Sequence, residues 1–173
     1  MQLQWEASKY LRDMEYQSNQ MILQASATLY PDKILIETID RVKDGFGISS
    51  ANMTILPVDT DIEILGSTVR RHLGLTKTGL PIPKDYKQHY SDFLRKAGFK
   101  NGKDHHRNAL LLHISQKDNE IKIGPTRNGG YTGKERGFLG IKDADIIVNS
   151  NIDNTTLGDK IKYGWSKCEC NRI

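Results

Sequence analysis

Two adjacent histidines, His105 and His106, are the side chains in this sequence best suited to metal binding or acid–base catalysis. A metal site needs further ligands at defined spacing, but no HExxH motif or paired cysteine accompanies these two residues. The other three histidines, His72, His89 and His113, are scattered along the chain. The sequence therefore predicts no catalytic residue and no metal site. A small metal-dependent hydrolase centred on His105 and His106 is kept as an alternative.

The stretch from Gly124 to Gly140 has the composition of a phosphate-binding loop but lacks its spacing. Six of its seventeen residues are glycine. The segment from Gly129 to Lys134 is one residue short of the Walker pattern, and Glu135 stands where that pattern needs Ser or Thr. We therefore expect an irregular surface loop and no nucleotide cofactor.

Other catalytic patterns are also missing, since the chain has no Gly-x-Ser-x-Gly motif and no paired catalytic carboxylates. What remains is a loop rich in Arg, Lys, Asn and Tyr, and Tyr and Arg carry much of the binding energy at protein interfaces. We therefore expect a binding protein that is not an enzyme. The candidate partner-binding residues are Arg127, Asn128, Tyr131, Lys134 and Arg136.

The elements that must position this loop follow from the apolar patterning. Helical spacing of apolar residues predicts helices over residues 1–19, 60–73, 84–97 and 155–168. Alternation and short apolar runs predict strands over residues 21–29, 33–39, 48–56, 109–114, 120–124, 138–141 and 144–148. Residues 100–108 are polar and are expected to form a loop. This order predicts one α+β domain over residues 1–173, a mostly antiparallel sheet with packed helices.

Helix boundaries and one internal repeat refine this prediction. Thr60 and Glu63 have the spacing of a capping box, and Gly74 and Gly98 stand where helix C-caps are expected. The pair Leu65-Gly66 recurs 92 residues later as Leu157-Gly158, each time early in a helix. Because glycine inside a helix costs about 1 kcal/mol relative to alanine, its recurrence predicts a close approach of each helix to the sheet.

Composition limits the class of protein. A length of 173 residues suits one domain, and no apolar run is long enough to cross a membrane. One residue separates Cys168 from Cys170, which is poor disulfide spacing, so we expect reduced thiols, Cys168 packed, and a cytoplasmic location.

The net charge is +4, and its densest basic segment runs from Lys84 to Arg107. That segment is either a solvated helix face with its loop or a nucleic-acid-binding surface.

The order of several short motifs resembles a known family. The motifs are Lys33–Thr38, Ile55–Pro57, Asp61–Gly66, Ile121–Thr126, Gly137–Phe138 and Leu157-Gly158. Together they cover about residues 33–168 and resemble the immunity proteins of contact-dependent growth inhibition, the CdiI family. Residues 1–30 lie outside this pattern, as an N-terminal extension.

This resemblance implies a cytoplasmic, non-enzymatic protein that forms a one-to-one complex with the C-terminal toxin domain of a cognate CdiA effector and neutralises it. The toxin domains are often nucleases. An inhibitor of a nuclease often presents acidic groups, whereas this chain is basic. Either residues 1–60, with a net charge of −3, supply the contact, or the toxin surface is acidic, or binding lies away from the toxin's active site. The alternative is a small nucleic-acid-binding module that uses residues 84–107.

Overall fold

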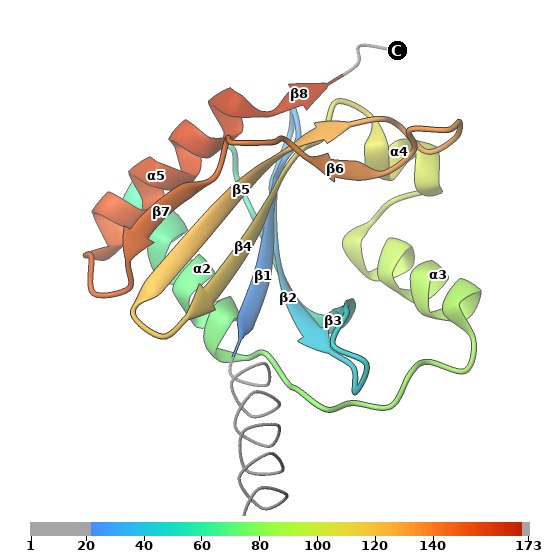
Figure 1. The fold of residues 1–173 in the computed structure, drawn as a ribbon. Coiled ribbons are helices and arrows are strands. Elements are labelled where there is room, and N and C mark those ends of the chain that lie inside the picture. The colour runs from blue at the N-terminus through green and yellow to red at the C-terminus, as the bar shows by residue number, and fades with distance from the viewer. Residues whose placement is uncertain (1–21, 171–173) are drawn as a thin grey trace, which may run out of the picture.

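The computed structural model describes residues 22–170, which form one α+β domain with helices on both faces of a largely antiparallel sheet (Figure 1). The strand order is β3-β2-β1-β4-β5-β6, and β7 and β8 also pair with β5. The strands are β1 (Leu23–Leu29), β2 (Ile34–Arg41), β3 (Gly47–Leu56), β4 (Leu110–Lys117), β5 (Glu120–Asn128), β6 (Phe138–Gly140), β7 (Ile146–Asn149) and β8 (Glu169–Cys170). The helices are α2 (Ile62–Gly74), α3 (Tyr86–Ala97), α4 (Gly102–His106) and α5 (Asn154–Lys167).

The predicted α+β class and mostly antiparallel sheet are confirmed. β1 pairs antiparallel with both β2 and β4, so it lies in the middle of the sheet. β4 and β5 form the second hairpin, whose turn places Asp118 at φ 52°, in the left-handed region. Among the strands of residues 22–170, β8 alone runs parallel to its neighbour, β5. The strand β5 extends to Asn128, further into the glycine-rich stretch than the alternation predicted.

One face of the sheet is apolar, and α2 and α5 cover it (Figure 1). Every second residue of β1 and β2 turns toward these helices, including Ala25, Ala27, Ile34 and Ile36. On α5, Trp165 is also buried there, and its indole N–H donates to the carbonyl of Ala27 over 3.0 Å. The larger apolar cluster therefore lies between these two helices and the central strands, and a second cluster joins Leu35 of β2 to Phe93 of α3 and Phe99.

Glycines allow α2 and α5 to approach each other closely. A methyl group on Gly66 would overlap the carbonyl oxygen of Asn154 in α5, and one on Gly158 would overlap the carbonyl oxygen of Ile62 in α2. The prediction of close approach at these two glycines is therefore correct, but the partner was wrong. Each glycine faces the other helix and not the sheet, because the two copies of the motif cross one another.

Several predicted boundaries need correction. Asp61, not Thr60, caps α2, because the Thr60 hydroxyl donates to the carbonyl of Pro57. Leu75 is the C-cap of α2 in place of Gly74, whereas Gly98 ends α3 in the left-handed conformation as predicted. Residues 102–106 form helix α4 within the predicted loop, because Asn101 caps its first turn.

The helix predicted over residues 1–19 lies outside the described residues. Cys168 packs against the core as predicted, and its thiol donates to the carbonyl of Leu111. Among residues 22–170, no helix is both long and apolar enough to span a membrane.

We predict that Gly66→Ala and Gly158→Ala each lower the free energy of unfolding by about 3 kcal/mol. The added methyl forces the helix backbones apart, and overpacking of this kind typically costs roughly 1–3 kcal/mol or more. Urea unfolding monitored by circular dichroism gives the difference. Gly74→Ala is the matched control, because nothing lies within 4 Å of a methyl group there. A Gly66→Ala variant as stable as the Gly74→Ala control would contradict the close crossing.

Candidate functional site

The face of the sheet opposite α2 and α5 carries a row of polar side chains. Glu37 of β2 pairs in register with Ser26 of β1, and Ser26 pairs with His113 of β4. His113 in turn lies opposite Gly124 of β5. Directly opposed residues have Cβ atoms roughly 5 Å apart, so these side chains form one line across the centre of the sheet.

A cavity of about 780 Å³ lies over this row. Its floor is the polar sheet face, and its walls include Tyr90 and Phe93 of α3, His105 of α4 and the segment 140–145 after β6. Figure 1 shows α3, α4 and β6 on this side of the sheet. The volume falls within the roughly 300–1,000 Å³ of typical ligand sites. The cavity therefore has room for an inserted side chain or a small molecule.

Glu37 is the acidic group at the bottom of the cavity. Its side chain is 7% exposed, and it accepts hydrogen bonds from the hydroxyls of Ser26, at 3.3 Å, and Ser49. Burial raises the pKa of Glu37 to about 7, while the two hydroxyl donors act in the opposite direction. A carboxylate with this pKa changes charge near neutral pH.

Ser49 also connects the cavity floor to α3. Its backbone carbonyl accepts a hydrogen bond from His89 Nε2 over 2.8 Å, while its hydroxyl donates to Glu37. About two turns further along α3, the Lys96 ammonium donates to the carbonyl of Ala51. These bonds hold α3 against β3 and so fix one wall of the cavity.

The two adjacent histidines are structural in this arrangement. His105 packs among aromatic rings, including Phe93 and Phe99 at 5.1 Å between centroids, and its Nδ1 lies 3.0 Å from the Tyr90 hydroxyl. Burial, with smaller contributions from neighbouring positive charge, lowers the pKa of His105 to about 3, so the ring is neutral. His106 stacks on Phe138 and donates from Nδ1 to the carbonyl of Gly102.

Among residues 22–170, no group of three or more His, Cys, Asp and Glu side chains could hold a metal ion. The aromatic neighbours of His105 and His106 explain both residues by packing. The alternative of a metal-dependent hydrolase therefore gains no support from the described part of the chain.

The structure brings the five predicted partner-binding residues to the end of β5 and the loop after it. Arg127 pairs with Glu135 at 3.4 Å, and Lys134 and Arg136 are exposed. Tyr131 is 45% exposed and packs its ring against His106. Together with α4, this loop borders a second, smaller pocket of about 370 Å³.

Asn128 differs from the other four because it is buried. Its amide donates to the carbonyls of His106 and Ala109, and its side-chain oxygen accepts from the backbone N–H of Gly130. These bonds join β5, α4 and the loop. Asn128 is therefore placed to position the loop.

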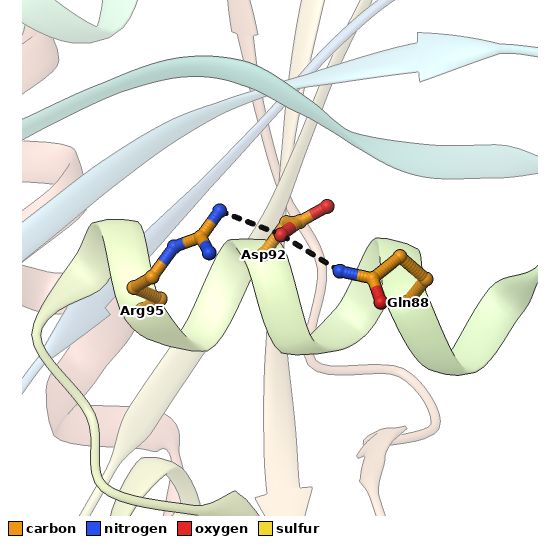
Figure 2. Close-up of polar contacts among 3 residues, drawn as sticks. All are labelled: Gln88, Asp92 and Arg95. Atoms are coloured by element: carbon orange, nitrogen blue, oxygen red, sulfur yellow. Dashed lines mark hydrogen bonds and ion pairs between the residues drawn. The ribbon is translucent and has the colours of Figure 1, made fainter.

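The basic segment 84–107 spans α3 and α4, and some of its charges have partners on the protein. Figure 2 shows Asp92 of α3 accepting hydrogen bonds from Gln88 and Arg95, at 3.0 and 2.7 Å. Both contacts follow helical spacing, three and four residues apart. This outer face of α3 has the mixed charge of a solvated helix face.

The polar row was not predicted from the sequence. Its signal was present in β1, where Gln24, Ser26 and Thr28 alternate with apolar residues, but not in β2, where Glu37 shares its face with Leu35 and Ile39. The alternation marks a polar face, but the register that aligns Ser26 with His113 joins residues far apart in the chain. No local pattern specifies such a pairing.

Comparison with known proteins gives consistent matches. The family model described as CdiI, CDI immunity protein, matches residues 23–168. Among solved structures, the "Protein of Unknown Function NMB0488 from Neisseria meningitidis" has a TM-score of 0.75 at 23% identity, covering 87% of this chain and 97% of that chain. Among curated proteins, none matches this sequence.

A second solved structure has the same fold. A chain of the "CdiA-CT/CdiI toxin and immunity complex from Yersinia pseudotuberculosis" has a TM-score of 0.71 at 16% identity. The match covers 86% of this chain and 98% of that chain. At these identities, both structures show that the fold is shared.

We predict that Glu37→Gln becomes more stable relative to the wild type as pH rises from 5 to 8. A raised carboxyl pKa means that the folded state holds a proton which the unfolded state releases above about pH 4.5, so wild-type stability falls until the pH passes 7. The full difference is roughly 3 kcal/mol, from about 1.4 kcal/mol per pKa unit. Denaturant unfolding of both proteins across this range measures it.

Other buried groups act in the opposite direction, so the comparison must be between variants. Burial lowers the pKa of His72 to about 4 and that of His105 to about 3, so these residues make wild-type stability rise with pH below about 6.5. Both are present in Glu37→Gln and cancel in the difference. Glu120→Gln removes the same charge at an exposed position and is the control. A pH-independent difference for Glu37→Gln would show that Glu37 is not desolvated.

Proposed function

We propose that this chain, which belongs to the CdiI family of CDI immunity proteins, binds the C-terminal toxin domain of a cognate CdiA effector and neutralises it. The family match over residues 23–168 carries this proposal. The shared fold with a chain of a CdiA-CT/CdiI toxin and immunity complex supports it. Residues 1–173 then act together as one immunity domain. The extension predicted over residues 1–30 is too long, because the family match begins at residue 23 and Leu23–Leu29 form β1 in the middle of the sheet.

The protein acts by occupying its partner and performs no reaction. Protection requires a complex that outlasts toxin delivery, and a Kd of 1 nM or below corresponds to about −12 kcal/mol. A one-to-one complex of this strength needs an interface of standard size or larger, roughly 1,600 Å² in total. The sheet face opposite α2 and α5, together with the loop at residues 129–137, offers both a cavity and exposed Tyr and Arg side chains for this contact.

The partner loop contributes contacts of two kinds. Arg127, Tyr131, Lys134 and Arg136 contact the toxin directly, since at least part of each side chain is exposed. Asn128 holds the loop in position from beneath through its bonds to α4. A loop fixed in advance loses less conformational entropy on binding, which favours high affinity.

We further propose that the toxin is a nuclease and that neutralisation takes place in the cytoplasm. A nuclease carries basic groups where it binds the phosphate backbone. The cavity presents Glu37 to such a surface as its unbalanced acidic group, because Lys122 and Lys142 offset Asp143 and Asp145. The overall positive charge of the chain does not prevent this contact, because complementarity depends on local charge.

The function is tested with the toxin domain encoded immediately upstream in the same locus. Its tightly controlled expression should stop growth, and co-expression of this protein should restore growth. The two proteins should co-purify at one to one in size-exclusion chromatography. Toxicity without rescue, or a neighbouring domain with no toxicity, would contradict the immunity function. A salt-titrated assay with duplex DNA and RNA would then test the basic segment 84–107.

We predict that the double variant Arg127→Ala/Tyr131→Ala weakens toxin binding at least tenfold. Truncating an Arg and a Tyr removes two side chains of the kind that dominate interface energetics, at about 1–2 kcal/mol or more each. Isothermal titration calorimetry with the purified toxin domain measures the change. Lys160→Ala is the control, because Lys160 is exposed on α5, on the other side of the sheet. Unchanged affinity of the double variant, with the fold intact, would exclude this loop from the interface.

A further inference from the structure

A buried carboxylate without a cationic partner lies at the inner end of the 780 Å³ cavity. Glu37 is 7% exposed, and among residues 22–170 it forms no ion pair. Its two partners, Ser26 and Ser49, are neutral hydroxyls. A carboxylate offers about four lone-pair directions, so roughly half of its accepting capacity is free. Buried charges are normally paired, and this one is complementary to a cation.

A second buried hydrogen-bond acceptor lies in the same cavity. Gln24 stands two residues before Ser26 and on the same face of β1. Within the described part of the chain, its side-chain oxygen is buried and has no hydrogen-bond donor. Glu37 and Gln24 therefore both present oxygen atoms that need donors. A group carrying several N–H bonds and a positive charge would satisfy both.

The remaining charges around the cavity do not cancel Glu37. Lys122 pairs with Asp145 at 3.4 Å, and Lys142 and Asp143 also border the cavity. These two lysines and two aspartates balance one another near the opening. The charge at the inner end is therefore that of Glu37 alone.

The titratable rings facing the cavity add no positive charge near neutral pH. His113 lies in the polar row, and burial lowers its pKa. His105 is neutral for the same reason, and burial raises the pKa of the Tyr90 phenol to about 12, which keeps it protonated. No group in the described walls thus neutralises the carboxylate of Glu37 at pH 7 and above.

We propose that the cavity receives an arginine side chain of the bound toxin domain, whose guanidinium pairs with Glu37 and donates to Gln24. The proposal rests on the immunity function and names the chemistry of its contact. Arginine fits better than lysine, because its planar group carries five N–H donors and can bridge two acceptors, whereas an ammonium is a point charge. The long apolar stem of arginine suits a deep site with aromatic walls at Tyr90 and Phe93.

The effect of burial on the ionisation of Glu37 supports this assignment. Burial raises its pKa to about 7, so the ionised form is disfavoured in the free protein. A cation that enters the cavity reverses this effect, because it stabilises the ionised form. Neutralising Glu37 should therefore stabilise the free protein and weaken the complex. A residue with only a structural role would not give these opposite signs.

The test is calorimetric titration of the toxin domain encoded upstream into wild type, Glu37→Gln and Glu120→Gln at pH 8. We expect Glu37→Gln to weaken binding at least tenfold while its unfolding midpoint equals or exceeds that of the wild type. Glu120→Gln removes the same charge from an exposed position and should bind within twofold of the wild type. Equal affinities for wild type and Glu37→Gln would overturn the proposal and leave the immunity function intact.

A second measurement separates failure of this site from failure of the proposed function. Methylguanidinium chloride is titrated into the free wild-type protein, with methylammonium chloride as the comparison, and backbone amide shifts in β1 and β2 are followed by NMR. Saturable shifts around Glu37 that disappear in Glu37→Gln would support the cation site even if the toxin domain does not bind. The absence of such shifts, together with no toxin binding, would overturn it.

Discussion

The close crossing of α2 and α5 determines how the rest of the molecule is arranged. Gly66 and Gly158 let each helix backbone touch a carbonyl oxygen of the other, so both helices fit over one face of the sheet. Arg70 of α2 reinforces the crossing, because its guanidinium donates to the carbonyls of Ser150 and Ile152 and to the side chain of Asn154. The pair seals the apolar face of the central strands. The opposite face is then free to carry polar groups without loss of the core.

That freedom explains why a buried carboxylate is tolerated at the centre of the sheet. Ionised Glu37 reduces stability, whereas the apolar core on the other side of the same strands supplies it. Features that cost stability are commonly kept at sites where function needs them. A serine hydroxyl on each side, from Ser26 and Ser49, holds the carboxylate toward the cavity. In the proposed complex, the polar row is the site that receives the partner.

Sequence patterns predicted most of the fold and little of the cavity. Alternation in β2 placed Ile34 and Ile36 on the apolar face, because side chains of a strand alternate with a period of two. The LG repeat revealed that two glycines need close neighbours but not that the helices are each other's neighbours, since this depends on tertiary packing. The helix α4 was missed because its residues are polar and its single turn depends on the Asn101 cap. Likewise, the alignment of Glu37 with His113 arises from pairing across three strands.

The missed helix α4 also connects the two parts of the proposed interface. Asn128 ties α4 to the end of β5, and His106 stacks on Phe138 at the start of β6. The loop at residues 129–137 is therefore anchored at both ends, next to His105, which forms part of the cavity wall. A partner that contacts the exposed Tyr131 and Arg136 therefore also lies close to the cavity. The loop would then provide contact area and orientation, while the cavity provides a single charged contact that only a correctly placed basic side chain can satisfy.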